Sequence, residues 1–329
     1  MIYDSKPADA GYWKNRKILI TGAGGFIGSH LTERLLREGS VVRTFIRYNS
    51  ANSFGLLESI PEMYRRDIEI HSGDITDEAS ILPALKDTEV VFHLAAIPSI
   101  PYSLLNPRQV FQVNTVGTFN LLLASKAAGV RRVVITSSAG ASEKRSLLSP
   151  YIMSKAAMEK VGLGFHEGSA LQVSTIRLMN NYGPRQSARA IIPTIISQAL
   201  TRNDVHLGAL EPKMDFNFVD DTVEAILRTA ENDNAQGRIL HWGTGLSISI
   251  KELAGLIFNI INNKELHIVT DEKRVRPYAG PAASLEEEIS DTHRLLNYSP
   301  AVELEAGLKR TISWINSNIE KYKTEIYNI

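Results

Sequence analysis

The chain has 329 residues, of which 43% are hydrophobic, so it can bury a large core and form one large domain with a smaller lobe. Its 36 basic and 36 acidic side chains balance, which argues against nucleic acid or a membrane as a partner. It contains no cysteine, which excludes disulfides, thiolate metal sites and a cysteine nucleophile, and no metal site is predicted. Because residues 1–16 lack an apolar signal-peptide core and no run of about 18 apolar residues is present, we predict a cytoplasmic protein.

The stretch 17–36 is typical of a buried strand, a tight turn and a helix. Its apolar start enters a glycine cluster with GxxGxxG spacing. In such a turn the first glycine permits the bend, the second lets the backbone approach a pyrophosphate, and the third packs helix against strand. The helix N-terminus offers N–H groups and a positive dipole end to the phosphates. The predicted cofactor contacts of this dinucleotide-binding turn are Gly22, Gly25, Phe26, Ile27 and Gly28.

Strands and helices alternate over the first two thirds of the chain, which predicts an α/β fold of the Rossmann type with a doubly wound parallel sheet. We expect its domain to comprise residues 1–178 plus about 216–247, and a smaller C-terminal lobe to comprise 179–215 plus about 248–329. The predicted strands are 17–20, 41–47, 67–71, 89–96, 132–136, 171–177 and 238–243. The predicted helices include 110–128, one beginning near residue 151, 190–200, 250–261 and 303–320.

The second predicted strand bears on the choice of dinucleotide. Folds that prefer NAD usually end this strand in Asp or Glu, which binds the ribose 2′-hydroxyl. Here it ends in Arg47, which, helped by Arg43, would meet a 2′-phosphate, so NADP is favoured over NAD; the alternative is a solvated surface arginine. A carboxylate at the end of the third strand would accept a hydrogen bond from the adenine amine. The predicted adenosine-side contacts are Arg47, Asn49, Ser50, Asp74 and Ile75.

Tyr151 and Lys155 stand at i and i+4, on one face of a predicted helix. An ammonium near a phenol lowers the pKa of the phenol, which predicts a base able to act near neutral pH on a sugar or alcohol hydroxyl. Ser137 and Ser138 follow the strand 132–136, where a hydroxyl can hold the same substrate oxygen. Taken alone, the Tyr–Lys pattern is common by chance, and its alternative is an ordinary solvated helix face.

With these motifs in place, the chain resembles an extended short-chain dehydrogenase/reductase of the nucleotide-sugar epimerase/dehydratase family over nearly its whole length. The resemblance implies that Ser138, Tyr151 and Lys155 form a catalytic triad, with Lys155 also holding the nicotinamide ribose. It implies further cofactor contacts from Leu94, Ala95, Ala96, Asn114 and Thr136. The matching stretches are TGAGGFIGSHL (21–31), GDITD (73–77), FHLAA (92–96), NTVGTFNLL (114–122), TSSA (136–139), YxxxK (151–155) and NNYGPRQ (180–186).

The resemblance also implies a substrate and a partner. The sequences of residues 185–195 and 216–221 look most like those of sugar-nucleotide 4,6-dehydratases. This resemblance favours a UDP-sugar as the substrate, and UDP-N-acetylglucosamine is the one we expect. An arginine near the C-terminal end would grip the diphosphate. Members of the family usually pair through helices corresponding to 110–128 and 151–166, so a homodimer is expected. The implied substrate contacts are Asn180, Arg189, Ile191, Val205, Leu207, Lys213 and Arg276.

One departure from the family pattern concerns the reaction. Typical 4,6-dehydratases carry an acidic residue and a Glu or Lys directly after the Ser/Thr, where this chain has Ala139 and Gly140. Glu143 and Lys144 are the acid/base candidates that remain nearby, unless they belong to a charged surface turn. We expect a 4,6-dehydratase that oxidises C4, eliminates water across C5–C6 and returns hydride to C6. The alternative is a 4-epimerase or 4-keto reductase, which needs no such pair; a non-enzymatic sensor would be expected to lack the Tyr or the Lys.

Overall fold

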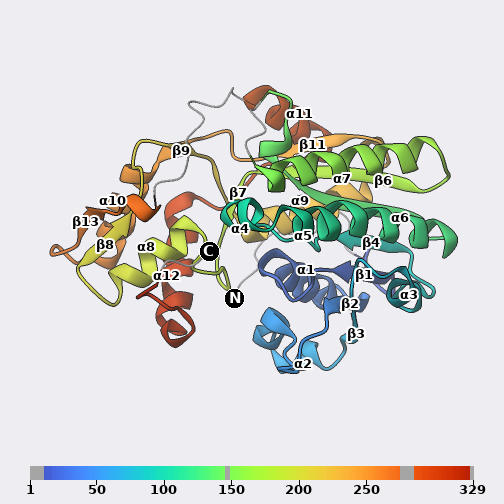
Figure 1. Cartoon of the computed structure of the whole chain (residues 1–329), viewed down its shortest axis with the longest axis horizontal. Helices are drawn as coiled ribbons and strands as arrows, with labels where there is room; N and C mark the ends of the chain where they lie inside the picture. The colour runs from blue at the N-terminus through green and yellow to red at the C-terminus, as the bar shows by residue number, and fades with distance from the viewer. Residues whose placement is uncertain (1–10, 145–148, 275–284, 327–329) are drawn as a thin grey trace.

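A parallel sheet of seven strands forms the centre of the protein (Figure 1), which the computed structural model describes over residues 11–144, 149–274 and 285–326. The strand order is β3-β2-β1-β4-β5-β6-β11, so the Rossmann order gains one strand at its edge. The predicted fold class is therefore confirmed. The strands are β1 (Lys17–Thr21), β2 (Val41–Arg47), β3 (Glu69–Gly73), β4 (Val90–His93), β5 (Arg132–Ser138), β6 (Gln172–Leu178) and β11 (Ile239–Trp242).

Helices cover both faces of this sheet, which is why its central strands are almost continuous apolar runs. On one face α6 (Gly117–Ala127) and α7 (Pro150–Glu167) lie side by side and bury Leu121 and Met158 against β4 and β5. On the other face α1 (Phe26–Arg37) packs against α9 (Val219–Glu231), which also contacts β5 and β6. The short helices of this domain are α2 (Glu62–Arg65), α3 (Glu78–Ile81), α4 (Ile100–Leu105) and α5 (Pro107–Phe111).

A smaller lobe lies beside the sheet (Figure 1); its described residues form short strand pairs and the helices α8, α10 and α12. Its strands pair as β7 with β10, β8 with β13, and β9 with β12. Helix α11 (Glu286–Leu296) lies in the sequence of this lobe but packs against β11 of the large sheet. The remaining elements are β7 (Asn180–Tyr182), α8 (Ile191–Ala199), β8 (Asp204–Leu207), β9 (Lys213–Met214), β10 (Phe216–Phe218), β12 (Ile248–Ser249), α10 (Ile250–Ile261), β13 (His267–Thr270) and α12 (Leu304–Asn316).

The segment before β1 folds back onto the large domain. Trp13 is 1% exposed, its ring contacts Phe92 of β4, and its indole N–H donates to Glu231 of α9 at 2.6 Å. This contact ties the chain's first described residues to both the sheet and one covering helix. None of the helices in the described ranges has the length and apolar character needed to cross a bilayer.

Element boundaries differ from the sequence prediction in two instructive places. Strand β5 continues two residues further, to Ser138, because Ser137 and Ser138 pair with β6. The helix predicted over 110–128 is three pieces, since a π-helical turn at Gln112–Val116 separates α5 from α6. Such π-turns are frequent at functional sites, and this one carries Asn114.

Candidate active site

The glycine turn between β1 and α1 leaves no room for a side chain at Gly22 or Gly28. A Cβ on Gly22 would lie 2.6 Å from the Ala95 nitrogen, and one on Gly28 would lie 2.3 Å from the Gly22 carbonyl oxygen. Helix α1 begins after Gly25, and no described side chain caps its N-terminus or places an acidic group in its first turn. Its first N–H groups are therefore left for an anion, which fits the pyrophosphate of a dinucleotide.

Residues predicted to contact the adenosine lie at the end of β2 and on the loops after β2 and β3. Arg47 ends β2 and is exposed, whereas Arg43 bonds to Glu69 and to two backbone carbonyls, so the assistance predicted from Arg43 is wrong. The Asn49 amide exchanges two hydrogen bonds with Ser53 inside its own loop. Asp74 is exposed and accepts hydrogen bonds from Thr76. Of the two other predicted contacts, Ser50 is exposed and Ile75 is buried.

Tyr151, Ser138 and Lys155 meet at the carboxyl end of β5. Helix α7 is capped by Ser149, which puts Tyr151 in its first turn and in a hydrogen bond with Ser138. One turn further, the ammonium of Lys155 donates to the carbonyl oxygen of Thr136 at 2.9 Å. The side chain of Lys155 is buried, whereas Tyr151 is half-buried. The structure thus brings together the three residues that the resemblance singles out.

The charge states in this cluster differ from expectation. Burial raises the pKa of the Tyr151 phenol to about 12, although the hydrogen bond with Ser138 acts in the opposite direction. Burial also lowers the pKa of Lys155 to about 8, with an opposing contribution from Glu159. The prediction that the Lys155 ammonium lowers the pKa of Tyr151 is therefore wrong for the protein by itself. Desolvation of the phenolate has the larger effect and raises that pKa.

Asn114 connects the helices that flank the cluster. Its side chain is buried, donates to the Ser154 hydroxyl at 2.9 Å and accepts from the Ile97 N–H at 2.8 Å. The half-buried residues 94–96 follow β4 next to the glycine turn, where the Ala95 N–H donates to Thr21 of β1. The ends of β1, β4 and β5 and the start of α7 thus converge, as ligand sites of open α/β sheets do.

Sequence reasoning missed a buried group behind this cluster. Ser137 does not join Ser138, since its hydroxyl donates to Glu159 of α7 at 2.6 Å. Glu159 is also bound by Arg177 of β6, which in turn contacts His241 of β11. The available signal was the position of Glu159 four residues after Lys155, which places both side chains on one helix face.

The predicted substrate residues are spread over the smaller lobe. Asn180 and Lys213 are exposed, and the Asn180 amide donates to the Asp215 carbonyl at 3.1 Å. Val205 and Leu207 are buried in the core of the lobe, so a contact of β8 with a base would use its main chain rather than these side chains. Arg189 is exposed, Ile191 is half-buried, and Arg276 lies outside the described residues.

Glu143 and Lys144 form ion pairs with residues outside the cluster. Glu143 is exposed, and its carboxylate lies 3.5 Å from the ammonium of Lys160. Lys160 is nine residues beyond Tyr151 on α7, which corresponds to roughly 13 Å along a helix axis. Lys144 forms an ion pair with Glu288 of α11 and is exposed. The alternative of a charged surface turn describes both residues better than an acid/base pair does.

Comparisons with known proteins agree with this geometry. A family model described as GDP-mannose 4,6 dehydratase matches residues 19–311. The UDP-glucose 4-epimerase of Mycolicibacterium smegmatis is 32% identical over 320 residues, which cover 92% of this chain and 99% of the relative. A dTDP-glucose 4,6-dehydratase of Streptomyces griseus is 31% identical over 320 residues, covering 92% and 94%. MoeE5, solved with UDP-glucose and NAD, superimposes with a TM-score of 0.79 at 26% identity, covering 92% of this chain and 99% of that one. The chain therefore belongs to the nucleotide-sugar epimerase/dehydratase family of extended short-chain dehydrogenases/reductases.

Proposed function

We propose that the protein is a nucleotide-sugar 4-epimerase that works on a UDP-hexose. The observation that supports this reaction most directly is the turn after Ser138. It consists of Ala139, Gly140 and Ala141, and the acid/base candidates that follow this turn in the sequence, Glu143 and Lys144, form ion pairs with Lys160 and Glu288. An epimerase needs no acid or base beyond the group that serves O4, whereas elimination across C5–C6 does. The relative of M. smegmatis favours the same reaction and a UDP-sugar.

The roles of the residues follow from their placement. Tyr151, with a pKa of about 12, holds its proton at neutral pH and is suited to return a proton to O4. To accept that proton it needs a cationic neighbour, and Lys155 stands one helical turn away. Ser138, which is hydrogen-bonded to Tyr151, can form a hydrogen bond with the same sugar oxygen. A bound nicotinamide supplies reversible hydride transfer at C4, and the glycine turn and the residues 94–96 would hold that cofactor.

Two observations bear on whether the bound dinucleotide is NADP or NAD, and they point in opposite directions. Arg47 ends β2 in place of a carboxylate and is exposed, which favours NADP. MoeE5 was solved with NAD, which favours NAD. We expect NADP to be released when the purified protein is denatured, with identification by mass spectrometry. Release of NAD alone would overturn the argument from Arg47.

The reaction is tested by incubating the protein with UDP-glucose, UDP-N-acetylglucosamine and GDP-mannose and following the sugars by NMR. We expect a C4 epimer of a UDP-sugar with no loss of the C6 hydroxyl. A 6-deoxy-4-keto product would overturn the epimerase proposal. That product would instead support the second candidate, a 4,6-dehydratase, which is favoured by the family model over residues 19–311 and by the relative from S. griseus.

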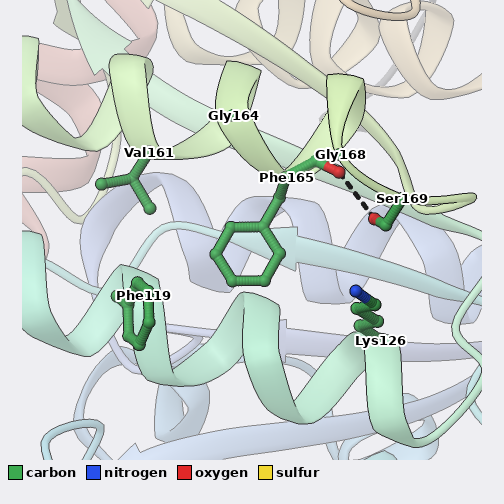
Figure 2. A pocket seen from close by; sticks show the side chains of 7 residues that line it. All are labelled: Phe119, Lys126, Val161, Gly164, Phe165, Gly168 and Ser169. Carbon is green, nitrogen blue, oxygen red and sulfur yellow. Dashed lines mark hydrogen bonds between the residues drawn. The ribbon is translucent and has the colours of Figure 1, made fainter.

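A second copy of the chain is the proposed partner. The π-helical turn before α6, α6 itself and α7 expose Val116, Phe119 and Met153, with exposed fractions of 39%, 45% and 49%. Figure 2 shows a hollow on this face, in which the rings of Phe119 and Phe165 meet edge to face. In a two-fold dimer one apolar patch meets its own copy, so a self-complementary face suffices. The hollow is lined by Phe119, Lys126, Val161, Gly164, Phe165, Gly168 and Ser169.

This assembly is tested by light scattering on the eluting protein. We expect the mass of a dimer, and a monomer for Phe119→Glu, because a carboxylate would be buried without a partner. Met63→Glu is the matched control, since Met63 is 61% exposed on α2. A dimer that survives Phe119→Glu would place the interface elsewhere.

A further inference from the structure

Three neighbouring strands carry polar side chains in one row, directly behind the catalytic cluster. Ser137 of β5 is in register with Arg177 of β6, which is in register with His241 of β11. Side chains along a strand alternate between the two faces of a sheet, so these three share one face and Ser138 points to the other. Helix α7, which contacts β5 and β6, places Glu159 over this row.

The row and Glu159 form a closed hydrogen-bonded group. Glu159 is 1% exposed and accepts two bonds from Arg177, at 2.8 and 2.6 Å, the fork geometry of a strong ion pair. Ser137 donates to the same carboxylate at 2.6 Å. Arg177 also donates to the Ala141 carbonyl and to Nε2 of His241, each at 3.1 Å. Because a guanidinium only donates, His241 must accept at Nε2 and carry its proton on Nδ1.

We propose that Glu159 is a positioning residue that keeps Lys155 in its ammonium form beside Tyr151, and that Arg177 and Ser137 hold the carboxylate for this purpose. Glu159 follows Lys155 by one helical turn, so the two charges lie on the same face of α7. Through its bond to Ala141, Arg177 links the group to the turn that follows Ser138. The consequence for catalysis rests on the proposed function, in which Lys155 supplies the positive charge that Tyr151 needs.

The electrostatic surroundings of Lys155 show why an anion is needed there. Burial lowers the pKa of Lys155 to about 8, and the attraction of Glu159 opposes that effect. His93 of β4 is neutral, since burial and the nearby Lys155 lower its pKa to about 3. Tyr151 on the same helix, Arg177 on β6 and His241 on β11 also face this region, and none of them is an anion at neutral pH. Glu288 of α11 interacts with His241 from the far side but is paired with Lys144. Without Glu159, Lys155 would lose its proton below its present pKa and become neutral in the working range.

The test is a titration of Lys155 in the full chain, labelled with lysine carrying ¹³C at Cε and followed by NMR. The signal is assigned by its loss in Lys155→Arg. We expect Glu159→Gln to move the midpoint of Lys155 down by about one pH unit or more, and Glu159→Asp to restore most of the shift. Arg177→Gln is the matched control: it breaks the same ion pair but removes a positive charge, so the midpoint should stay or rise.

Two results would overturn the proposal: an unchanged midpoint in Glu159→Gln, or an equal downward shift in Arg177→Gln, which would mean that the network matters only for packing. If Glu159→Gln does not fold, the double variant Glu159→Gln/Arg177→Gln removes the uncompensated cation and should still show a lowered midpoint; an unchanged one counts against the proposal. The titration needs no sugar, so it is independent of the epimerase test. Where turnover is measurable, the alkaline limb of kcat should move down in Glu159→Gln by the same amount.

Discussion

The backbone of Gly28 lies so close to that of Gly22 that the effect of a side chain at Gly28 on cofactor binding can be predicted quantitatively. A Cβ on Gly28 would lie 2.3 Å from the Gly22 carbonyl oxygen and 2.8 Å from the Ala23 Cα. Carbon and oxygen normally approach to about 3.3 Å, so Gly28→Ala must push α1 away from the turn by roughly 1 Å. Both partners are backbone, so no side chain can rotate away. Such overpacking costs about 1–3 kcal/mol, against about 1 kcal/mol gained from the helix propensity of alanine.

The same displacement moves the N–H groups of the first turn of α1 away from the position of the pyrophosphate. We therefore expect Gly28→Ala to raise the Kd of the nicotinamide dinucleotide by about tenfold or more, which corresponds to about 1.4 kcal/mol, as measured by calorimetric titration. Gly255→Ala is the control, since Gly255 is exposed in α10 and a Cβ there meets nothing within 4 Å. It should leave the Kd unchanged and stabilise the fold by up to about 1 kcal/mol. An unaltered Kd in Gly28→Ala would refute the idea that this turn binds the cofactor.

Three further predictions concern other parts of the chain. Trp13→Ala should lower the free energy of unfolding by about 3–5 kcal/mol in urea titrations, because Trp13 is buried and bonded to Glu231; a loss below about 1 kcal/mol would contradict this. The buried imidazole of His93 lies between the hydroxyls of Thr21 and Thr118, and its pKa is lowered from 6.5 to about 3. As the pH falls, the unfolded chain therefore protonates His93 before the folded protein does, and the free energy of unfolding falls between pH 6.5 and about 3. His93→Gln should remove about 1.4 kcal/mol per pH unit from that slope, and equal slopes would exclude a buried neutral imidazole. Tyr151→Phe should lower kcat about 10²–10⁴-fold while the Kd of the dinucleotide stays unchanged, and retained turnover would exclude Tyr151 as the group that serves O4.

The fold was predictable because its signals are local and mutually consistent. Apolar runs alternate with helical segments, and the glycine spacing after the first strand fits a single type of turn. Parallel sheets need helices on both faces, so the strand and helix order alone restricts the topology to few arrangements. The return of α11 to the edge strand β11 carried no such signal. Its packing depends on contacts between segments about fifty residues apart, which local pattern does not encode.

The candidate site was predictable in its residue types but not in its electrostatics. The spacing of Tyr151 and Lys155 specifies one helix face, and the structure places both at the end of β5. Spacing says nothing about desolvation, however, and burial moves the pKa of Tyr151 up and that of Lys155 down. Arg43 is a second example. Its positive charge suggested a phosphate contact, but in the structure its guanidinium donates a hydrogen bond to Glu69.

The adjacent serines after β5 show why register has to be known before roles are assigned. In the sequence Ser137 and Ser138 are equivalent candidates for holding a substrate oxygen. Because β5 continues through both residues, their side chains must point to opposite faces of the sheet. Ser137 thereby reaches Glu159 under α7, whereas Ser138, the last residue of β5, interacts with Tyr151 at the start of the same helix. Had the strand ended at Thr136, as the apolar pattern suggests, neither assignment would follow. The two-residue extension of β5 is therefore what separates the serine proposed to hold the sugar oxygen from the serine that donates a hydrogen bond to Glu159.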